Sequence, residues 1–262
     1  MKVKKRLKKK LKKNLTRWGV MAIVVFLIIL FSGKLFSKKQ IMNQLDYDIT
    51  LNEDGSATIV ETWDIYISHT NTLFRTFDKS NKFGDIINVN VKDLDTGKDL
   101  MQIDEEMYHV TKGCFYALDI NFKQFEVAWG TGMENKMGTK RYQFSYTITD
   151  AVNDYKDCQE FYWTLLADNN QIPVNKVTGT IKMPSKVNDI DNLKAWGHGP
   201  LNGNIEIDSK NEVKFSVDRL NKNKMLEVRI VTTEEQFKVS PEKEKNYRYL
   251  QSIIEEELRL VK

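Results

Sequence analysis

The sequence predicts a mainly β protein: an antiparallel β-sandwich, or two packed in series, between an N-terminal transmembrane helix and a C-terminal amphipathic helix. Three observations predict this organisation. A basic run precedes an uncharged stretch near the N-terminus, many short segments between residues 45 and 231 alternate apolar with polar residues, and helical spacing replaces this alternation after Thr233. Alternation with a period of two indicates strands that bury one face, and many short strands with polar turns are typical of sandwiches.

The N-terminal segment predicts where the protein is located. Residues 1–17 carry ten Lys or Arg and no acid, and residues 18–33 carry no charge. Basic residues before a first apolar segment hold that end in the cytoplasm, so the chain after residue 39 is expected outside. The lysine that follows the uncharged stretch can snorkel, which extends the span to residue 36. Because an A-x-A cleavage signal is missing, we expect an uncleaved anchor at residues 18–36, with a removed signal peptide as the alternative.

Charge separates the two parts of the chain. The basic cytoplasmic tail, residues 1–17, is expected to bind the anionic inner leaflet, with a nucleic-acid-binding arm as the alternative. Residues 40–262 have the opposite balance, with 27 Lys or Arg against 36 Asp or Glu. This acidic excess argues against DNA or RNA as a partner of the exterior part. The predicted location is therefore the cell membrane, crossed once, with the lipid bilayer as the partner of residues 1–36.

Residues 40–239 are interpreted as the extracytoplasmic β-sandwich region. Gly55 and Gly97 each lie in a polar turn between two alternating segments, which is typical of hairpins. The expected strands lie, in order, at residues 47–51, 56–67, 87–100 (a hairpin), 114–122, 125–130, 140–152, 160–167, 176–184, 204–208, 212–218 and 225–231.

Residues 240–262 are expected to form the amphipathic helix. Ser240 is a suitable cap, and Pro241 suits the first helical position. Five apolar residues fall on one helical face: Leu250, Ile253, Ile254, Leu258 and Val261. This face is expected to lie on the membrane, to pack on the sandwich or to bind a partner's helices.

Glu61 is the one charged residue on the apolar row of the segment 56–67. A buried carboxylate needs a partner, because uncompensated burial costs several kcal/mol. Arg75, in the stretch FRTFD, is the next basic residue along the chain. We therefore predict a structural ion pair between Glu61 and Arg75, and the alternative is that Glu61 acts as a general acid or a ligand contact.

Residues 196–204, WGHGPLNGN, are expected to form a glycine-rich loop between strands. Trp196 and His198 on this loop are candidates for contacts with a sugar or a peptide, with Glu61 as a third candidate ligand-binding residue. The alternative is a structural turn in which His198 caps a backbone group.

The cysteines and the other histidines carry little chemistry. An oxidising exterior permits a disulfide between Cys114 and Cys158, and two free thiols are equally compatible with the sequence. His69 and His109 lie outside any zinc-binding spacing, and GxSxG, GxGxxG and CxxC motifs are absent from the sequence. We therefore predict no metal, no cofactor and no catalytic residue.

Four stretches give the exterior part a resemblance to a known family: YDITLNEDGSATIVETWDIYI, FRTFD, FYWTLLADNNQIPVNKVTGTIKMP and WGHGPLNGNIEID. Over about residues 45 to 260 the chain resembles the bacterial predicted membrane proteins of domain of unknown function 2207. The resemblance implies an extracytoplasmic β-rich domain and a following helix, after which family members commonly continue into further transmembrane segments. It carries over no catalytic residues, and it leaves open whether this is a short member or part of a longer protein.

The expected function is therefore non-enzymatic. The sequence favours a membrane-anchored interaction or assembly module of the bacterial cell envelope, with a membrane protein as its partner. The alternative is an envelope domain that binds, or also hydrolyses, glycan or peptide near Trp196, His198 and Glu61.

Overall fold

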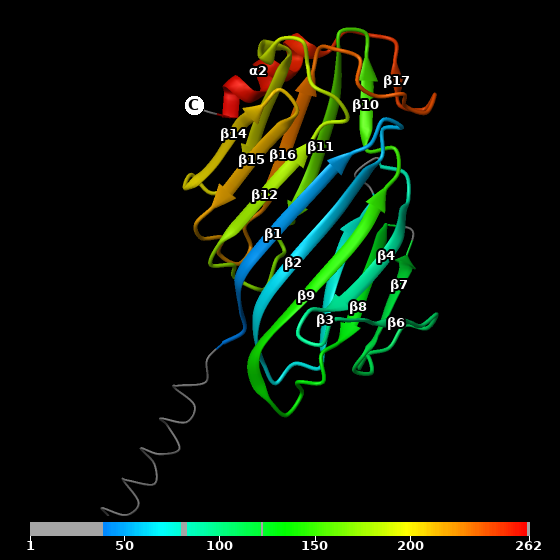
Figure 1. Cartoon of the computed structure of the whole chain (residues 1–262), viewed down its shortest axis with the longest axis vertical. Helices are drawn as coiled ribbons and strands as arrows, with labels where there is room; N and C mark the ends of the chain where they lie inside the picture. The colour runs from blue at the N-terminus through cyan, green and yellow to red at the C-terminus, as the bar shows by residue number, and fades with distance from the viewer. Residues whose placement is uncertain (1–38, 80–82, 122, 261–262) are drawn as a thin grey trace, which may run out of the picture. The chain divides into compact units, whose positions relative to one another are not determined.

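The computed structural model describes residues 39–79, 83–121 and 123–260. The tail at residues 1–17 and the anchor at residues 18–36 lie outside the described residues. Within the described ranges no helix is both long enough and apolar enough to span a membrane. Residues 40–262 form one compact unit, which is mainly β and is coloured from blue to red in Figure 1.

Eight strands form one large sheet. Only β1 and β12 run parallel in it; the other neighbours are antiparallel. The strand order is β14 (Gly203–Ser209), β15 (Glu212–Val217), β12 (Val177–Lys182), β1 (Ile41–Leu51), β2 (Ala57–Ser68), β9 (Met137–Ile148), β4 (Ile86–Asp93) and β5 (Lys98–Asp99).

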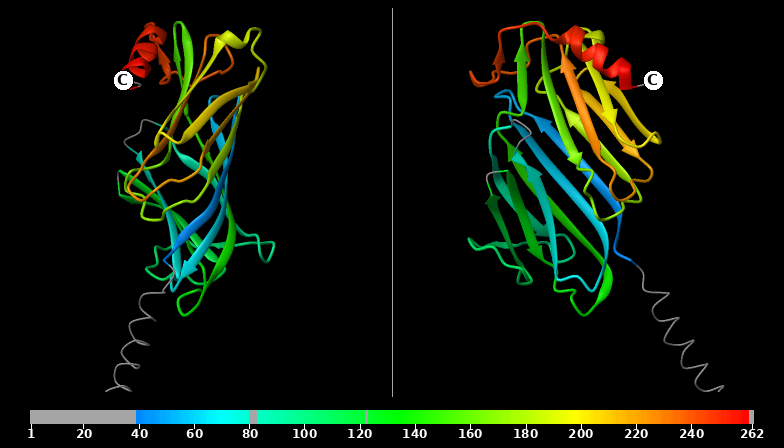
Figure 2. Two further views of the ribbon diagram at one scale, coloured as in Figure 1. Left: turned by 90° about the vertical axis from the view of Figure 1, so that its left-hand side faces the viewer. Right: turned by 180° about the vertical axis from the view of Figure 1, so that it is seen from behind.

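Two smaller sheets complete the fold. The sheet that we call the β11 sheet has the order β13 (Leu193–His198), β16 (Leu226–Thr232), β11 (Cys158–Leu166), β10 (Val152–Tyr155) and β17 (Glu244–Lys245). The β8 sheet has the order β3 (Thr72–Asp78), β8 (Gln124–Gly130), β7 (Cys114–Asn121) and β6 (Met101–Gln102). Figures 1 and 2 show the β11 sheet at the end of the unit that holds β14 and β15, and the β8 sheet near β9 and β4.

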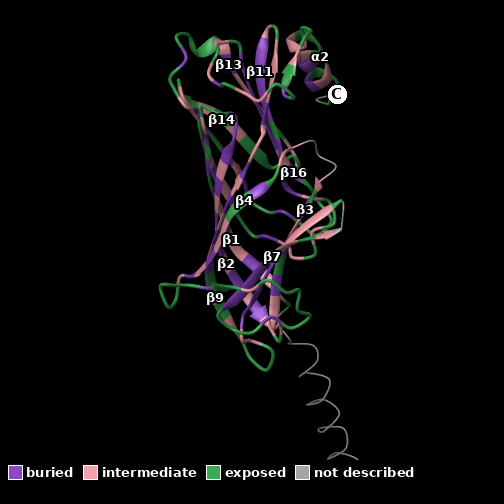
Figure 3. Ribbon diagram, turned by 90° about the vertical axis from the view of Figure 1, so that its right-hand side faces the viewer, coloured by how far each residue is buried: buried purple, intermediate pink, exposed green. Residues whose placement is uncertain are grey.

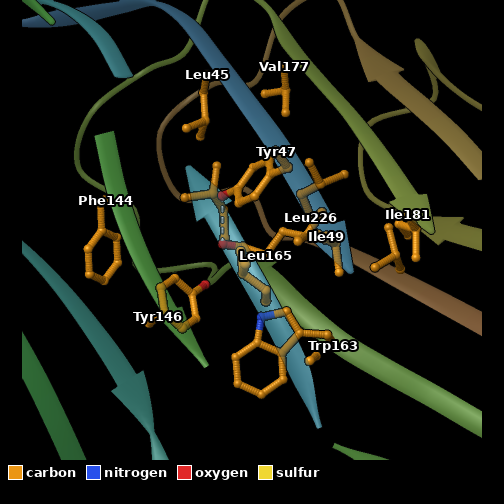
Figure 4. Packing of buried hydrophobic residues seen from close by; sticks show 14 of the residues in the cluster. Leu45, Tyr47, Ile49, Phe144, Tyr146, Trp163, Leu165, Val177, Ile181 and Leu226 are labelled. Atoms are coloured by element: carbon orange, nitrogen blue, oxygen red, sulfur yellow. Dashed lines mark hydrogen bonds between the residues drawn. The ribbon is translucent and has the colours of Figure 1, made fainter. Parts of the chain in front are cut away.

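One hydrophobic core joins all three sheets. It contains inward-facing residues of β1, β2 and β9 from the large sheet, of β11 and β16, and of β3 and β8. Figure 4 shows part of this core, where Tyr47 of β1 and Tyr146 of β9 lie close to Trp163 and Leu165 of β11. Both small sheets therefore pack against the same large sheet. The fold is not two separate sandwiches, each with its own pair of sheets.

The alternating pattern explains the strands of the large sheet. Along β2 every second residue is buried, from Ala57 to Ile67, and Figure 3 shows this burial in purple along β1, β2 and β9. The turn before β2 contains Gly55 at φ +77°, a conformation that glycine adopts without strain. Because one face of each strand meets the core, the register of β2 with β1 and β9 is set by its apolar row.

Five described strands were not predicted as separate strands: β3, β6 (Met101–Gln102), β10 (Val152–Tyr155), β13 and β17 (Glu244–Lys245). The alternating row of β3 contains Arg75 between Leu73 and Phe77, so its burial is not evident from polarity. The segment that holds Trp196 and His198 was expected to be a loop, but it forms β13 and pairs with β16. The turn follows only afterwards, at residues 199–202. The expectation rested on the glycines and the proline of this stretch, but Gly197 lies within β13, where pairing with β16 holds it extended, and only the residues after His198 turn.

The C-terminal helix is shorter than expected. It is α2, Leu250–Leu260, and residues 241–249 form turns and the two-residue strand β17 instead. Ser240 is therefore not its cap: Asp157 Oδ1 accepts hydrogen bonds from the Tyr249 amide at 2.8 Å and from the Leu250 amide at 3.4 Å. A side chain from a different part of the chain thus satisfies amides at the start of the helix.

The buried face of α2 also differs from the expectation. Its fully buried residues are Ile253 and Glu257, whereas Leu258 is 61% exposed. The difference arises because Glu257 finds charged partners on the β11 sheet. Val261 lies outside the described residues.

Candidate functional site

Glu61 lies in the core with three hydrogen-bond donors around its carboxylate. Its exposed fraction is 0%. Trp63 Nε1 donates to Oε2 at 2.9 Å, while Tyr146 Oη and Arg75 Nε donate to Oε1 at 3.0 and 3.3 Å. The predicted partner of Glu61 is thus the one found, and the carboxylate is compensated by one charge and two neutral donors.

Arg75 connects Glu61 to the β11 sheet. Its Nη2 donates to the Leu165 carbonyl oxygen, which also accepts from Tyr47 Oη at 3.1 Å; Figure 4 marks the bond from Tyr47. Burial lowers the pKa of Arg75, but the charge of Glu61, together with Tyr47, Tyr146 and the hydrogen bond to Glu61, outweighs this, and the net shift is upward. Burial, reinforced by Glu61, raises the pKa of Tyr146, so its hydroxyl stays a neutral donor. Glu61 of β2, Arg75 of β3 and Leu165 of β11 come from three different sheets, so the arrangement is a structural junction.

A second charged network covers the outer face of the β11 sheet. His198 of β13 contacts a carboxylate of α2, with Nε2 at 2.8 Å from Glu257 Oε2. Its Nδ1 lies 3.2 Å from Tyr162 Oη and 3.7 Å from Glu227 Oε2. Glu227 is held in turn by Tyr162 Oη, which donates at 2.8 Å, and by Thr164 Oγ1 at 2.7 Å.

Arg229 of β16 lies at the centre of this network and is 4% exposed. Its Nε donates to Glu160 Oε1 at 2.6 Å, and its Nη1 donates to Glu257 Oε1 at 2.9 Å and to Glu256 Oε2 at 3.0 Å. The guanidinium carbon also lies 5.1 Å from the ring centroid of Tyr162. Arg229 and His198 therefore bind α2 through the same carboxylate, Glu257.

The charges in this network shift one another's pKa. The carboxylate of Glu227, 3.7 Å from Nδ1, is the largest cause that raises the pKa of His198; burial opposes this, and Glu257 reinforces it. The same contact lowers the pKa of Glu227. Protonated His198 donates from Nε2 to Glu257 of α2 and from Nδ1 to Tyr162 Oη of β11, which in turn donates to Glu227.

Trp196 lies under α2 and does not form an open platform. It packs in a cluster with Cys158, Val231, Ile253, Tyr155, Tyr249 and Leu250. The proposed ligand residues are therefore not brought together: Trp196 and His198 meet α2, whereas Glu61 is in the core. Among the residues that the structure describes, Glu61 and His198 share no hydrogen-bond partner.

A family comparison decides the relationship of this chain to known proteins. The family model described as the predicted membrane protein (DUF2207) N-terminal domain matches residues 42–232. The chain belongs to this family. A comparison with curated protein sequences finds no match.

Solved structures resemble this DUF2207 domain only distantly. A protease candidate from Parabacteroides distasonis has a TM-score of 0.43 at 14% identity, over 74% of this chain and 40% of its own. A candidate nutrient-binding protein from Legionella pneumophila has a TM-score of 0.39 at 10% identity, over 74% and 67%. An M1 zinc metallopeptidase from Deinococcus radiodurans has a TM-score of 0.34 at 9% identity, over 73% and 42%. All three scores are below 0.5, so none supports a function for this chain.

The cysteines of the DUF2207 domain are free, so the disulfide alternative was wrong. Cys114 packs in one cluster with Val110, Tyr116 and Ala128, and Cys158 packs in another under α2. They lie in β7 and β11, on different small sheets, and cannot meet without rearrangement. Burial, aided by Asp157, raises the pKa of Cys158 to about 12, so this thiol is a poor nucleophile at neutral pH.

The remaining histidines lie apart from both networks. His69 and His109 line a surface hollow of about 530 Å³ together with Phe74 and Tyr108. Within the described ranges, no group of three or more His, Cys, Asp or Glu residues is placed to hold a metal ion.

Sequence reasoning missed Arg229, Glu227 and Glu257. The same kind of signal that identified Glu61, a charged residue within an apolar pattern, was present in the sequence. Arg229 interrupts the apolar run LEVRIV, in which all residues except Glu227 are buried, and Glu257 follows Ile253 by one helical turn. A charged residue among buried neighbours predicts a buried partner, although it does not say which residue the partner is.

Proposed function

We propose that residues 40–262 act as an extracytoplasmic interaction or assembly module of the bacterial cell envelope. A single anchor at residues 18–36 would hold the module to the membrane, with the N-terminus in the cytoplasm. Membership of a family of predicted membrane proteins supports this location, as does the basic run before the apolar segment. The module has no enzymatic activity of its own in this proposal.

The observation that carries the proposal is how α2 is docked. It turns Glu257 inward and leaves Leu258 and Leu260 outside, 61% and 68% exposed. Leu258 lies one helical turn after the half-buried Ile254 and so on the same side of the helix, and apolar residues that neighbour one another in this way are typical of a surface that contacts another apolar surface. We therefore propose that the outer side of α2 binds a helix of a membrane-protein partner.

The charged groups also support this proposal, because they argue against an open catalytic site. Glu61 and His198 were the titratable candidates for chemistry, and each is bonded to other residues of the chain, as are the buried arginines Arg75 and Arg229. Paired and covered groups are typical of structural networks rather than of open catalytic sites.

In-cell photo-crosslinking tests the proposal. A photoreactive amino acid at Leu258 should give a discrete band with one membrane protein. The matched control is the same amino acid at Thr96, which is exposed in the turn before β5 and should give no such band. Equal bands at both positions, or none at Leu258, would contradict the proposal.

A second candidate function is an envelope domain that binds glycan or peptide. One hollow of about 710 Å³ favours it, next to the turn after β13. Its lining combines amides and charges with one fully exposed leucine: Asp168, Asn202, Arg219, Asn221, Lys224 and Leu201. Such mixed polar groups suit hydroxyls and backbone amides. A crosslinker at Leu201 that captures glycan or peptide, while Leu258 captures no protein, would favour this candidate.

A further inference from the structure

We propose that α2 is a reversible, pH-responsive latch: it closes over Cys158 and Trp196 while His198 is protonated, and it opens when His198 loses its proton. The proposal concerns the docking of α2 on its own chain, so it does not depend on the partner proposed above.

The first step of the argument is that α2 depends on its docking site. It has eleven residues, and isolated helices shorter than about 12–15 residues are marginal in water. Its first amides are held by Asp157, a residue of the β10–β11 turn. Only Ile253 and Glu257 of the helix are fully buried. If these few contacts were lost, α2 would leave the sheet and lose its helical structure at the same time.

The second step is the charge balance beneath α2. The charged and titratable groups around His198 come from three elements: Glu160 and Tyr162 from β11, Glu227 and Arg229 from β16, and Glu256 and Glu257 from α2. Arg229 pairs with three of these four carboxylates, Glu160, Glu256 and Glu257, and Arg259 of α2 adds positive charge near Glu256. Protonated His198 places a further cation between Glu227 and Glu257.

The third step is the direction of the pH dependence. Docking raises the pKa of His198 through Glu257 of α2, whereas Glu227 of β16 lies beside β13 and raises this pKa whether the helix is docked or open. Protonation therefore favours the docked helix, and this contribution is complete below the pKa that His198 has in the open state. It is lost as the pH rises through the raised pKa of the docked state. Below about pH 5 the carboxylates take up protons and the contacts weaken again.

Cys158 provides a reporter within the protein. It is 4% exposed, and α2 contributes Ile253 and Leu250 to the cluster that covers it. The other thiol, Cys114, is buried in a separate cluster on the β8 sheet. Opening of the latch exposes Cys158 alone, whereas global unfolding exposes both.

The experiment measures maleimide labelling of both cysteines by mass spectrometry, in the full chain in detergent micelles, from pH 6 to pH 8.5. Each rate is divided by that of a short peptide with the same local sequence, which removes the pH dependence of the thiolate itself. We expect the protection of Cys158 to fall severalfold over this range, and by no more than about tenfold per pH unit, because one proton is lost per opening. Protection of Cys114 should stay constant.

Two variants keep the outcome decisive. Glu257→Gln removes the carboxylate that His198 and Arg229 share without changing the strands, so Cys158 should be weakly protected at every pH. His198→Gln should make the protection of Cys158 independent of pH. Constant protection of Cys158 in the unaltered chain, or parallel loss of protection at both cysteines, would overturn the proposal.

Discussion

Arg75 Nε lies 3.3 Å from Glu61 Oε1 in a core that is otherwise apolar. Glu61 belongs to the large sheet and Arg75 to the β8 sheet, while the second contact of Arg75, the Leu165 carbonyl oxygen, belongs to the β11 sheet. Apolar contacts tolerate small shifts, but a buried charge pair tolerates none without loss of a bond. We infer that this pair sets how the three sheets meet.

Removal of one charge from this pair should destabilise the fold strongly. Glu61→Gln leaves Arg75 buried without a carboxylate, so we expect the free energy of unfolding to fall by about 3–5 kcal/mol. Urea denaturation measures this change. The control is Glu61→Gln combined with Arg75→Met, which buries no charge and should cost less than the two single changes added together. Additive costs would show that the two residues are not coupled.

The cap supplied by Asp157 should matter for α2 alone. Asp157→Ala removes the acceptor for the Tyr249 and Leu250 amides, and the loss of a cap costs about 1 kcal/mol. Hydrogen exchange of residues 251–260 should become faster, while exchange in β2 stays unchanged. Asp104→Ala, in an exposed loop, is the matched control. If exchange in β2 rises as well, Asp157 supports the whole fold and not only the helix.

The pKa of His198 should depend on Glu227. Because the carboxylate of Glu227 is the largest cause that raises this pKa, Glu227→Gln should lower it toward the ordinary value. NMR titration of the imidazole Cε1–H measures the shift. Glu206→Gln changes an exposed carboxylate on β14 and should leave the titration as it was. An unchanged pKa in Glu227→Gln would assign the shift to Glu257 instead.

Both thiols should be free in the purified protein. The chain is denatured without reductant and alkylated, and intact-mass spectrometry should show two added groups, because Cys114 and Cys158 lie in separate clusters. A mass with no added groups and two fewer hydrogens would mean that a bridge forms, and it would require β7 and β11 to approach each other.

Much of the fold follows from local pattern. The alternation along β1, β2 and β9 predicts these strands, since every second residue faces one core. The same count places Glu61 in the buried row, and from this follows the need for a cationic partner. Helical spacing after Thr233 likewise predicts a C-terminal helix, although not where it begins.

The pairing of distant residues is not in the local pattern. One example is the parallel pairing of β1 with β12, and another is the packing of two smaller sheets on the large one. Both depend on contacts between apolar faces that are far apart in the sequence. β13 was taken for a loop because of the glycines near its end, although pairing with β16 makes it a strand. The helix start was misplaced because its cap, Asp157, is far away in sequence.

The sequence alone determined the strand periodicity, the buried position of Glu61 and the acidic balance of the exterior part, because each depends on residue type and spacing along the chain. Only the tertiary structure decided that Glu257 lies inward and Leu258 outward on α2. Arg229 and His198 provide the reason: a carboxylate that meets two cationic partners is stabilised when buried, and this outweighs the preference of a leucine for the same place.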